Sequence, residues 1–137
     1  MERVIADTGF VVALANRSDN RHGDVAQIYL QYPHILLPQL VLVEVAYLVG
    51  RDAGIATTVE LLRSLTTSRF EQISVTDDDV ERAANILEQY MDSKVDFVDA
   101  CIMAIAERLN IKTILTIDQR DFRLFRPKHC DSFSLLP

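Results

Sequence analysis

Short strand-like runs alternate with longer helical segments along most of this chain, and this alternation is the feature that most restricts its fold. The runs at residues 4–5, 34–38, 70–75 and 113–117 are short and bounded by turn-forming or polar residues, as buried strands are. Between them, apolar residues recur every three or four positions, as on one face of a helix. Strands that alternate with helices predict an α/β fold, here a three-layer α/β/α sandwich with a short, mainly parallel sheet.

The helical segments have recognisable boundaries. We expect helices over residues 9–16, 22–31, 39–54, 55–65, 76–92 and 95–110. Asp19 or Asn20 is expected to cap the second of them. Thr76 and Asp79 have the spacing of a capping box at the start of the fifth, so we interpret the acidic triplet 77–79 as helix N-terminal charge and not as a metal site.

Length and composition set broad limits. A chain of 137 residues, 49% hydrophobic and 25% charged, is typical of one globular domain, and we expect a single domain over residues 1–137. No apolar run reaches membrane-spanning length and no signal-peptide pattern opens the chain, so we expect a cytoplasmic protein with no membrane partner. Cys101 and Cys130 lack metal-ligand spacing and disulfide-framework density, which favours reduced thiols.

Two acids stand where a predicted strand stops. Asp7 follows the first strand, and Asp118 follows the run at residues 113–117. In open α/β sheets, ligands bind beyond the carboxyl ends of the strands. Asp7 is therefore either the cap of the next helix or a ligand in that crevice, with Gly9 easing the turn. Asp118 repeats the pattern and favours the ligand.

Further acids occur in predicted helices that are otherwise apolar. Burying the ionised carboxylate of Glu44 alone is costly, so we expect Glu44 to face a cleft. The alternatives are a place on a thin solvent-exposed stripe of the helix or a pair with an arginine such as Arg51. Asp96 and Asp99, three residues apart, share one helical turn. Their alternative role is capping, with Asp96 as the cap and Asp99 answering from the first turn.

Carboxylates gathered in one crevice predict a metal site. They repel one another and raise one another's pKa unless a cation joins them. Mg2+ and Mn2+ prefer such oxygen ligands, and the sequence shows no Cys/His set of the kind that Zn2+ prefers. A carboxylate-held Mg2+ pairs with phosphate oxygens, so the pattern predicts hydrolysis of a nucleic-acid backbone. The net charge of -6 argues against nucleic acid until a bound cation reverses the local sign.

Arginines provide the candidate RNA contacts. Arg17 and Arg21 lie in a polar loop, and Arg120 and Arg123 lie in the densest basic stretch of the chain. Both groups suit phosphate contact. Their alternative is a solvated loop and a solvated tail, respectively.

The order of four segments resembles the PIN-domain nucleases, especially the VapC-like toxin ribonucleases. The segments are an apolar strand with DTG, then LVEVAYL, FVDACIMAIAERL and ILTIDQRDF, and together they span most of the chain. The resemblance implies a quartet of catalytic and metal-binding acids: Asp7, Glu44, Asp99 and Asp118. It also implies three auxiliary candidates: Asp96, Thr116 and Asp121.

What the resemblance implies about activity is specific. It implies a PIN-like endoribonuclease that depends on Mg2+ or Mn2+ and acts on structured RNA. It further implies a homodimer and a small antitoxin protein whose basic tail plugs the acidic site. We expect a helical antitoxin segment in a groove beside residues 40–49. Asp19 and His22 match a pattern found in part of the family, without an assigned role.

Other functions fit single motifs. DTG also occurs in aspartic proteases, where two Asp residues share a proton, but those enzymes are all-β. A phosphatase with an aspartyl nucleophile usually carries a second Asp two residues on, where this chain has Gly9. A non-catalytic PIN-like module that binds RNA or protein is the alternative from another class, and the intact quartet argues against it.

Overall fold

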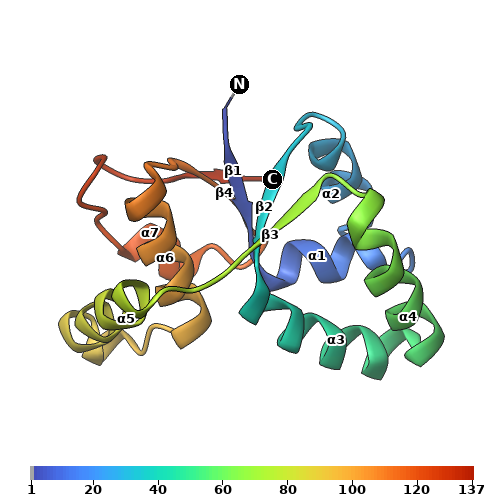
Figure 1. Ribbon diagram of the computed structural model, residues 1–137, viewed down its shortest axis with the longest axis horizontal. Helices are drawn as coiled ribbons and strands as arrows, with labels where there is room; N and C mark the ends of the chain where they lie inside the picture. Colours follow the sequence, from blue (N-terminus) through green and yellow to red (C-terminus); the bar gives the residue numbers. More distant parts are fainter. Residues whose placement is uncertain (1) are drawn as a thin grey trace.

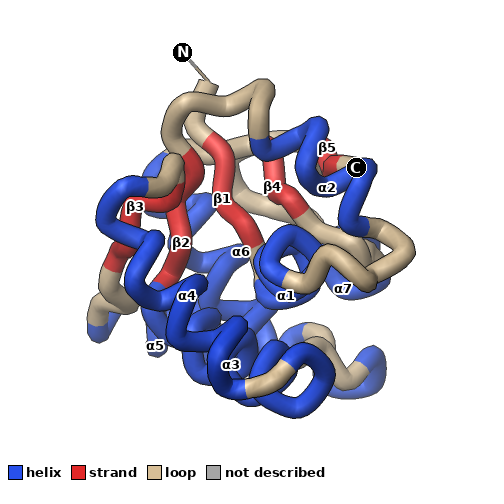
Figure 2. Tube along the Cα trace, turned by 90° about the vertical axis from the view of Figure 1, so that its right-hand side faces the viewer, coloured by secondary structure: helices blue, strands red, loops and turns tan. Residues whose placement is uncertain are grey.

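A five-stranded parallel sheet forms the centre of the computed structural model, which describes residues 2–137. Its strands are β1 (Val4–Ala6), β2 (Ile35–Pro38), β3 (Phe70–Ile73), β4 (Thr113–Leu115) and β5 (Ser134–Leu136). They lie in the order β3-β2-β1-β4-β5, and each neighbouring pair is parallel. Figure 2 shows β1 and β4 side by side near the middle of this sheet. The predicted parallel sheet is confirmed.

Within residues 2–137, seven α-helices cover the sheet. They are α1 (Thr8–Ala15), α2 (His22–Tyr29), α3 (Gln39–Ala53), α4 (Ile55–Ser64), α5 (Asp77–Gln89), α6 (Phe97–Leu109) and α7 (Arg120–Leu124). Single 3-10 turns follow α4 at Leu65–Thr67 and α5 at Met91–Ser93. Figure 1 shows α1 to α4 on one side of the sheet and α5 to α7 on the other, which is the predicted three-layer arrangement. Among the described residues, no helix is long and apolar enough to cross a membrane.

Burial explains why the central strands are continuous apolar runs. Every residue of β1, β2 and β4 is buried, because helices cover both faces of a parallel sheet. The edge strand β3 differs, since its Glu71 and Gln72 are exposed. The apolar sequence of α6 has the same cause, because its residues from Ala100 to Ala106 are all buried.

The order in which the chain adds strands to the sheet reverses at β1. From β1 it adds β2 and β3 on one side, and it then crosses to β4 and β5 on the other. Open α/β sheets bind ligands at such a switch point, beyond the carboxyl ends of the two strands. The backbone N–H of Asp7 donates to the carbonyl of Leu115 at 3.0 Å, so the ends of β1 and β4 are held together there.

Two predicted helix starts differ from the structure. Gly9 lies inside α1 with helical backbone, and a Cβ at this position would meet Asp7 Oδ1 at an ordinary 3.9 Å, so the interpretation of Gly9 as a turn residue is wrong. Arg21 occupies the N-cap position of α2 without a side-chain cap. The Asp19 carboxylate instead accepts the N–H of Arg21 at 2.8 Å, so neither Asp19 nor Asn20 caps this helix.

The C-terminal segment is folded, contrary to the interpretation of its basic stretch as a solvated tail. The strand predicted over residues 113–117 ends at Leu115, and the basic stretch contains the short helix α7. The unpredicted strand β5 then pairs with β4 through bonds such as that from the N–H of Thr116 to the carbonyl of Leu136, 2.7 Å long. Its three-residue sequence is too short to show a period of its own.

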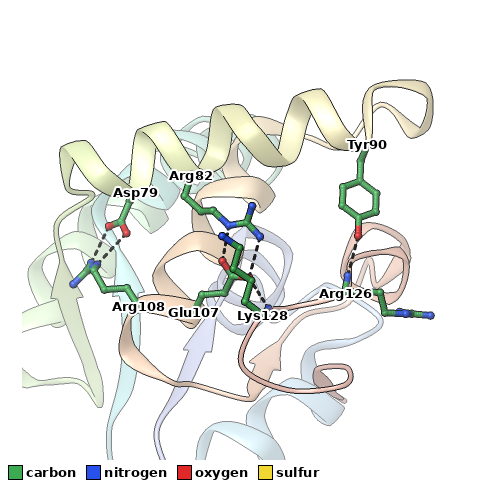
Figure 3. A network of polar contacts seen from close by, with 7 residues as sticks. All are labelled: Asp79, Arg82, Tyr90, Glu107, Arg108, Arg126 and Lys128. Carbon is green, nitrogen blue, oxygen red and sulfur yellow. Dashed lines mark hydrogen bonds and ion pairs between the residues drawn. The ribbon is translucent and has the colours of Figure 1, made fainter.

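Ion pairs join α5 to α6 (Figure 3). Arg108 Nη2 lies 2.8 Å from Asp79 Oδ2, and Arg82 Nε lies 2.7 Å from Glu107 Oε1. Asp79 also completes the predicted capping box with Thr76, which confirms the interpretation of the acidic triplet as the start of a helix. The Asp79 side chain is 2% exposed, and its fork-shaped pairing with Arg108 compensates the burial of its charge.

Candidate active site

Asp7 stands at the carboxyl end of β1 and also caps α1. Its Oδ1 accepts the N–H of Phe10 at 3.3 Å, and its Oδ2 accepts a hydrogen bond from the Thr116 hydroxyl. The residue is 6% exposed, and this burial raises the pKa of its carboxyl to about 6, with a smaller contribution from the charge of Asp118. The two interpretations of Asp7 are therefore compatible, because one carboxylate oxygen caps the helix and the other faces the end of β4.

Asp99 approaches the same crevice from the first turn of α6. Burial raises the pKa of its carboxyl to about 9, and its contact with Asp121 and the charges of Asp7 and Asp96 contribute to this rise. A carboxyl whose pKa is raised by three neighbouring acids lies in an acidic cluster. The structure thus brings Asp99 and Asp7 together across the gap between α6 and β1.

Glu44 reaches the crevice from the middle of α3. Its Oε1 accepts a hydrogen bond of 2.8 Å from the hydroxyl of Thr8, the residue that follows Asp7. Arg51 instead pairs with Asp52 at 2.8 Å, which rules out the alternative in which it pairs with Glu44. Thr8 is a site residue that sequence reasoning missed, although its place inside the DTG triplet was a signal.

Asp118 lies in the turn after β4 and is exposed. Because β4 ends at Leu115, Asp118 does not terminate the strand as predicted. The Thr116 hydroxyl lies 3.0 Å from the backbone carbonyl of Asp118, which ties this turn to the same side chain that contacts Asp7. Thr116 therefore places Asp118 at the rim of the crevice, where its charge contributes to the raised pKa of Asp7.

Asp121 anchors the segment that leads into α6. It is 8% exposed, and its Oδ2 accepts the backbone N–H of Asp96 at 3.1 Å. Its Oδ1 pairs with Arg120 Nη1 at 2.7 Å, and Arg120 also donates to the carbonyl of Ser93. These contacts hold α7 against the N-terminus of α6, so Asp121 contributes to the placement of Asp99.

Asp96 stands at the N-cap position of α6 but makes no side-chain hydrogen bond to the first turn. The predicted capping box of Asp96 with Asp99 is therefore absent. Burial raises the pKa of the Asp96 carboxyl, and the charges of Glu44 and Asp121 add to this effect. The backbone N–H groups of Asp99 and Phe97 lower this pKa in part, so the carboxylate lies near both the first turn of α6 and the neighbouring acids.

The family follows from comparison with known proteins. A family model described as PIN domain matches residues 4–126. The chain belongs to the PIN-domain family. This confirms the resemblance found in the sequence, and the α/β/α fold agrees with it.

Individual relatives of this PIN domain are ribonucleases. The chain is 28% identical to Ribonuclease VapC26 of Mycobacterium tuberculosis, over 98% of this chain and 100% of that protein. It is 30% identical to the 23S rRNA-specific endonuclease VapC20 of the same organism, over 84% and 88%. The crystal structure of VapC20, a sarcin-ricin loop cleaving toxin, matches with a TM-score of 0.78 at 26% identity and covers 85% of this chain and 90% of that one. A toxin-antitoxin complex from Klebsiella pneumoniae shares the fold, with a TM-score of 0.64 at 22% identity over 87% and 89%.

The candidate RNA-binding arginines of the PIN domain lie in separate places. The eight residues of α1 separate Asp7 from the loop of Arg17 and Arg21, a distance of about 12 Å. The structure therefore does not bring these two arginines to the acids. Arg120 is tied to Asp121, whereas Arg123 contacts only neutral groups and lines a hollow beside α7.

The loop after α1 has a structural role that accounts for two unassigned residues. The ring nitrogen Nδ1 of His22 lies 2.8 Å from the carbonyl of Ala13, and Asp19 holds the backbone of Arg21. Both contacts fix the start of α2 against the end of α1. A separate hollow of about 770 Å³ lies beyond this end of α1 and is lined in part by Arg17 and Leu61.

The acids provide the type of oxygen donor found in metal sites, but they do not surround a single metal position. Within residues 2–137, no three or more His, Cys, Asp or Glu side chains lie close enough together to hold a metal ion as they stand. Burial and the neighbouring acids raise the pKa of Asp7 and of Asp99, and within residues 2–137 neither carboxylate forms an ion pair. A hard divalent cation would relieve this repulsion, so the oxygen donors fit Mg2+ or Mn2+.

Proposed function

We propose that this PIN domain is an endoribonuclease that hydrolyses RNA phosphodiester bonds, as the toxin of a toxin-antitoxin pair. The proposal is supported by acids near the carboxyl ends of β1 and β4: the charges of Asp118 and Asp99 act on or with Asp7, and Glu44 accepts the hydroxyl of the neighbouring Thr8. The names of VapC26 and VapC20 as a ribonuclease and an rRNA endonuclease support the same activity. No observation favours a non-catalytic module.

We propose Mg2+ or Mn2+ as the cofactor, held by the four acids of this quartet. Bound there, either ion activates water and neutralises charge on a phosphodiester. The protein's own part is to orient the ligand oxygens beforehand, through the bond of Thr116 to Asp7 and that of Thr8 to Glu44. We assign Asp96 and Asp121 auxiliary roles, since their charges and contacts position Asp99.

Metal removal tests this function. The purified chain is expected to cleave ribosomal RNA in Mg2+ or Mn2+, to lose cleavage in excess EDTA, and to recover it when Mn2+ is added back. Gel electrophoresis of end-labelled RNA measures the products. Cleavage should occur only when the ion is present, because the acids alone repel a phosphodiester. Undiminished cleavage in EDTA would contradict the proposal.

RNA shape is the proposed basis of substrate choice. Acids that bind a metal act on the RNA backbone and do not distinguish one base from another. The choice of substrate therefore depends on the loops and structured regions of the RNA. This agrees with the description of VapC20 as a sarcin-ricin loop cleaving toxin. We propose that structured RNA in the cytoplasm is the substrate, and that residues 1–137 act as one nuclease domain.

We propose two protein partners, a second copy of the chain and a small antitoxin. The exposed face of α3 supports the docking of an antitoxin helix beside residues 40–49, because Val43 and Tyr47 are 75% and 68% exposed and lie one turn apart.

Light scattering is expected to give about twice the 15.5 kDa mass of the chain alone. Coexpression with the neighbouring reading frame is expected to yield a larger, inactive complex that a Tyr47→Asp variant fails to form. A monomer, or full activity with every coexpressed partner, would count against these partners.

A further inference from the structure

A second hollow lies beside α7, on the way to β5. Its volume is about 370 Å³, within the range of sites that hold small ligands. Two arginines contribute to a lining that is otherwise polar or aromatic for the most part. The lining residues are Gln119, Phe122, Arg123, Arg126, Ser132, Phe133 and Leu135.

Both arginines are held in place by neutral groups. Arg123 Nη2 donates to Gln119 Oε1 at 2.7 Å, and Arg126 Nη1 donates to the carbonyl of Arg123 at 2.7 Å. The backbone N–H of Arg126 donates to the Tyr90 hydroxyl at 3.1 Å, and Figure 3 shows the Arg126 side chain pointing away from the ion pairs of α5 and α6. In residues 2–137, neither guanidinium has a carboxylate within 4.0 Å.

The hollow is linked to the acids by the segment before α7, in which Gln119 donates to the carbonyl of Thr116. Gln119, one wall of the hollow, directly follows Asp118. Successive residues of a helix point about 100° apart, so Arg123 projects from the side of α7 opposite to Asp121, which faces α6. The hollow and the crevice thus lie on two sides of one short helix, a separation of about 10 Å.

We propose that Arg123 and Arg126 bind a backbone phosphate of the RNA near the cleaved bond. The forked guanidinium matches two phosphate oxygens and suits this ligand better than an ammonium group. Among the predicted RNA-binding arginines, Arg120 is already engaged by Asp121. In a chain of net charge -6, the two guanidinium groups supply positive charge that attracts a phosphate, whereas the carboxylates repel it. The inference rests on the proposed ribonuclease function.

Direct binding tests the pocket. A fluorescent oligoribonucleotide is titrated with the uncleaving Asp99→Asn protein, with and without Arg123→Ala/Arg126→Ala. We expect the double change to weaken binding about tenfold, because it removes charge-assisted hydrogen bonds to a phosphate. The slope of log affinity against log salt should fall by about 0.7 for each phosphate that the protein no longer neutralises. The matched control, Arg63→Ala/Lys112→Ala, removes two exposed positive charges elsewhere and should leave both values nearly unchanged.

A chemical change in the RNA locates the bound phosphate. Each linkage of the oligoribonucleotide is replaced in turn by an uncharged methylphosphonate. At one linkage near the cleaved bond, the protein with intact arginines is expected to bind about tenfold more weakly, whereas the affinity of the arginine double variant stays the same, which is the mark of a direct pair. Equal decreases in both proteins at every linkage would overturn the proposal.

The remaining outcomes separate this inference from the function on which it rests. If the unchanged chain does not cleave RNA in Mn2+, the proposed function fails and the phosphate pocket fails with it. If cleavage is normal and the arginine double variant binds RNA like the control, only the pocket is refuted. An acidic segment of the antitoxin is the competing occupant, and loss of antitoxin capture with unchanged RNA binding would assign the pocket to that protein.

Discussion

Replacing Asp99 by Asn is expected to abolish RNA cleavage without unfolding the protein. The substitution keeps the shape of the side chain and removes the carboxyl group near Asp7 that the proposed metal would bind. Since the proposed site would place metal-bound charge against a phosphodiester, we expect the cleavage rate to fall by a factor of about 100 or more. Asp7→Asn should have the same effect and should also weaken the hydrogen bond with Thr116. Timed cleavage of end-labelled RNA in saturating Mn2+ measures both variants.

A control on the same scaffold makes this result interpretable. Asp78→Asn changes an exposed acid in the first turn of α5 and should leave the rate unchanged. Circular dichroism should show the same helix content for all variants, because the fold places these acids at a crevice and not in the core. Near-normal cleavage by Asp99→Asn would remove Asp99 from the quartet and with it the proposed metal site.

The same substitutions are expected to make the metal-free protein more stable at neutral and alkaline pH. In the fold, the pKa of Asp7 is about 6 and that of Asp99 about 9, both above the ordinary value of 3.8. Between about pH 4 and pH 9 the folded state therefore holds more protons than the unfolded state. The free energy of unfolding falls as pH rises through this window. Asp99→Asn removes the largest part of this effect.

Thermal melts in EDTA at several pH values measure the expected change. At about pH 8, Asp99→Asn should melt several degrees above the unchanged protein, since 1 kcal/mol corresponds to roughly 4 °C in a domain of this size. The difference should shrink toward about pH 4, where both carboxyls are protonated in the fold. Asp78→Asn should match the unchanged protein at every pH. A lower melting temperature for Asp99→Asn under alkaline conditions would mean that its charge is already compensated.

Metal should reverse this order. A cation that binds only the folded state adds about 2.7 kcal/mol at a concentration roughly a hundredfold above its dissociation constant. Mn2+ is therefore expected to raise the melting temperature of the unchanged protein at alkaline pH and to leave that of Asp99→Asn nearly unchanged. Equal increases in both proteins would place the bound metal away from Asp99.

Local patterns in the sequence predicted most of the helices and the parallel sheet, because the spacing of apolar residues along the chain reflects both burial and the helical period. The chain around Asp7 shows the limit of this reasoning. Sequence reasoning offered a cap or a ligand as alternatives, and the structure gives each role to a different oxygen of one carboxylate. The partners of Glu44 and Asp96 could not be predicted correctly, because their contacts come from distant segments.

The strand order and the contacts around the acids required the tertiary structure. β5 exists because its backbone pairs with β4, and three residues carry too little pattern to predict such a pairing. Arg120 and Arg123 belong to the same basic stretch of the sequence, yet the fold turns one toward Asp121 and the other into a hollow that it shares with Arg126. The sequence by itself determined which residue types are available and where the helices α1 to α6 and the strands β1 to β4 form, to within a few residues. The tertiary structure decided which carboxylates share a crevice and which arginine stays unpaired within residues 2–137, because distances between remote segments depend on how the whole chain packs.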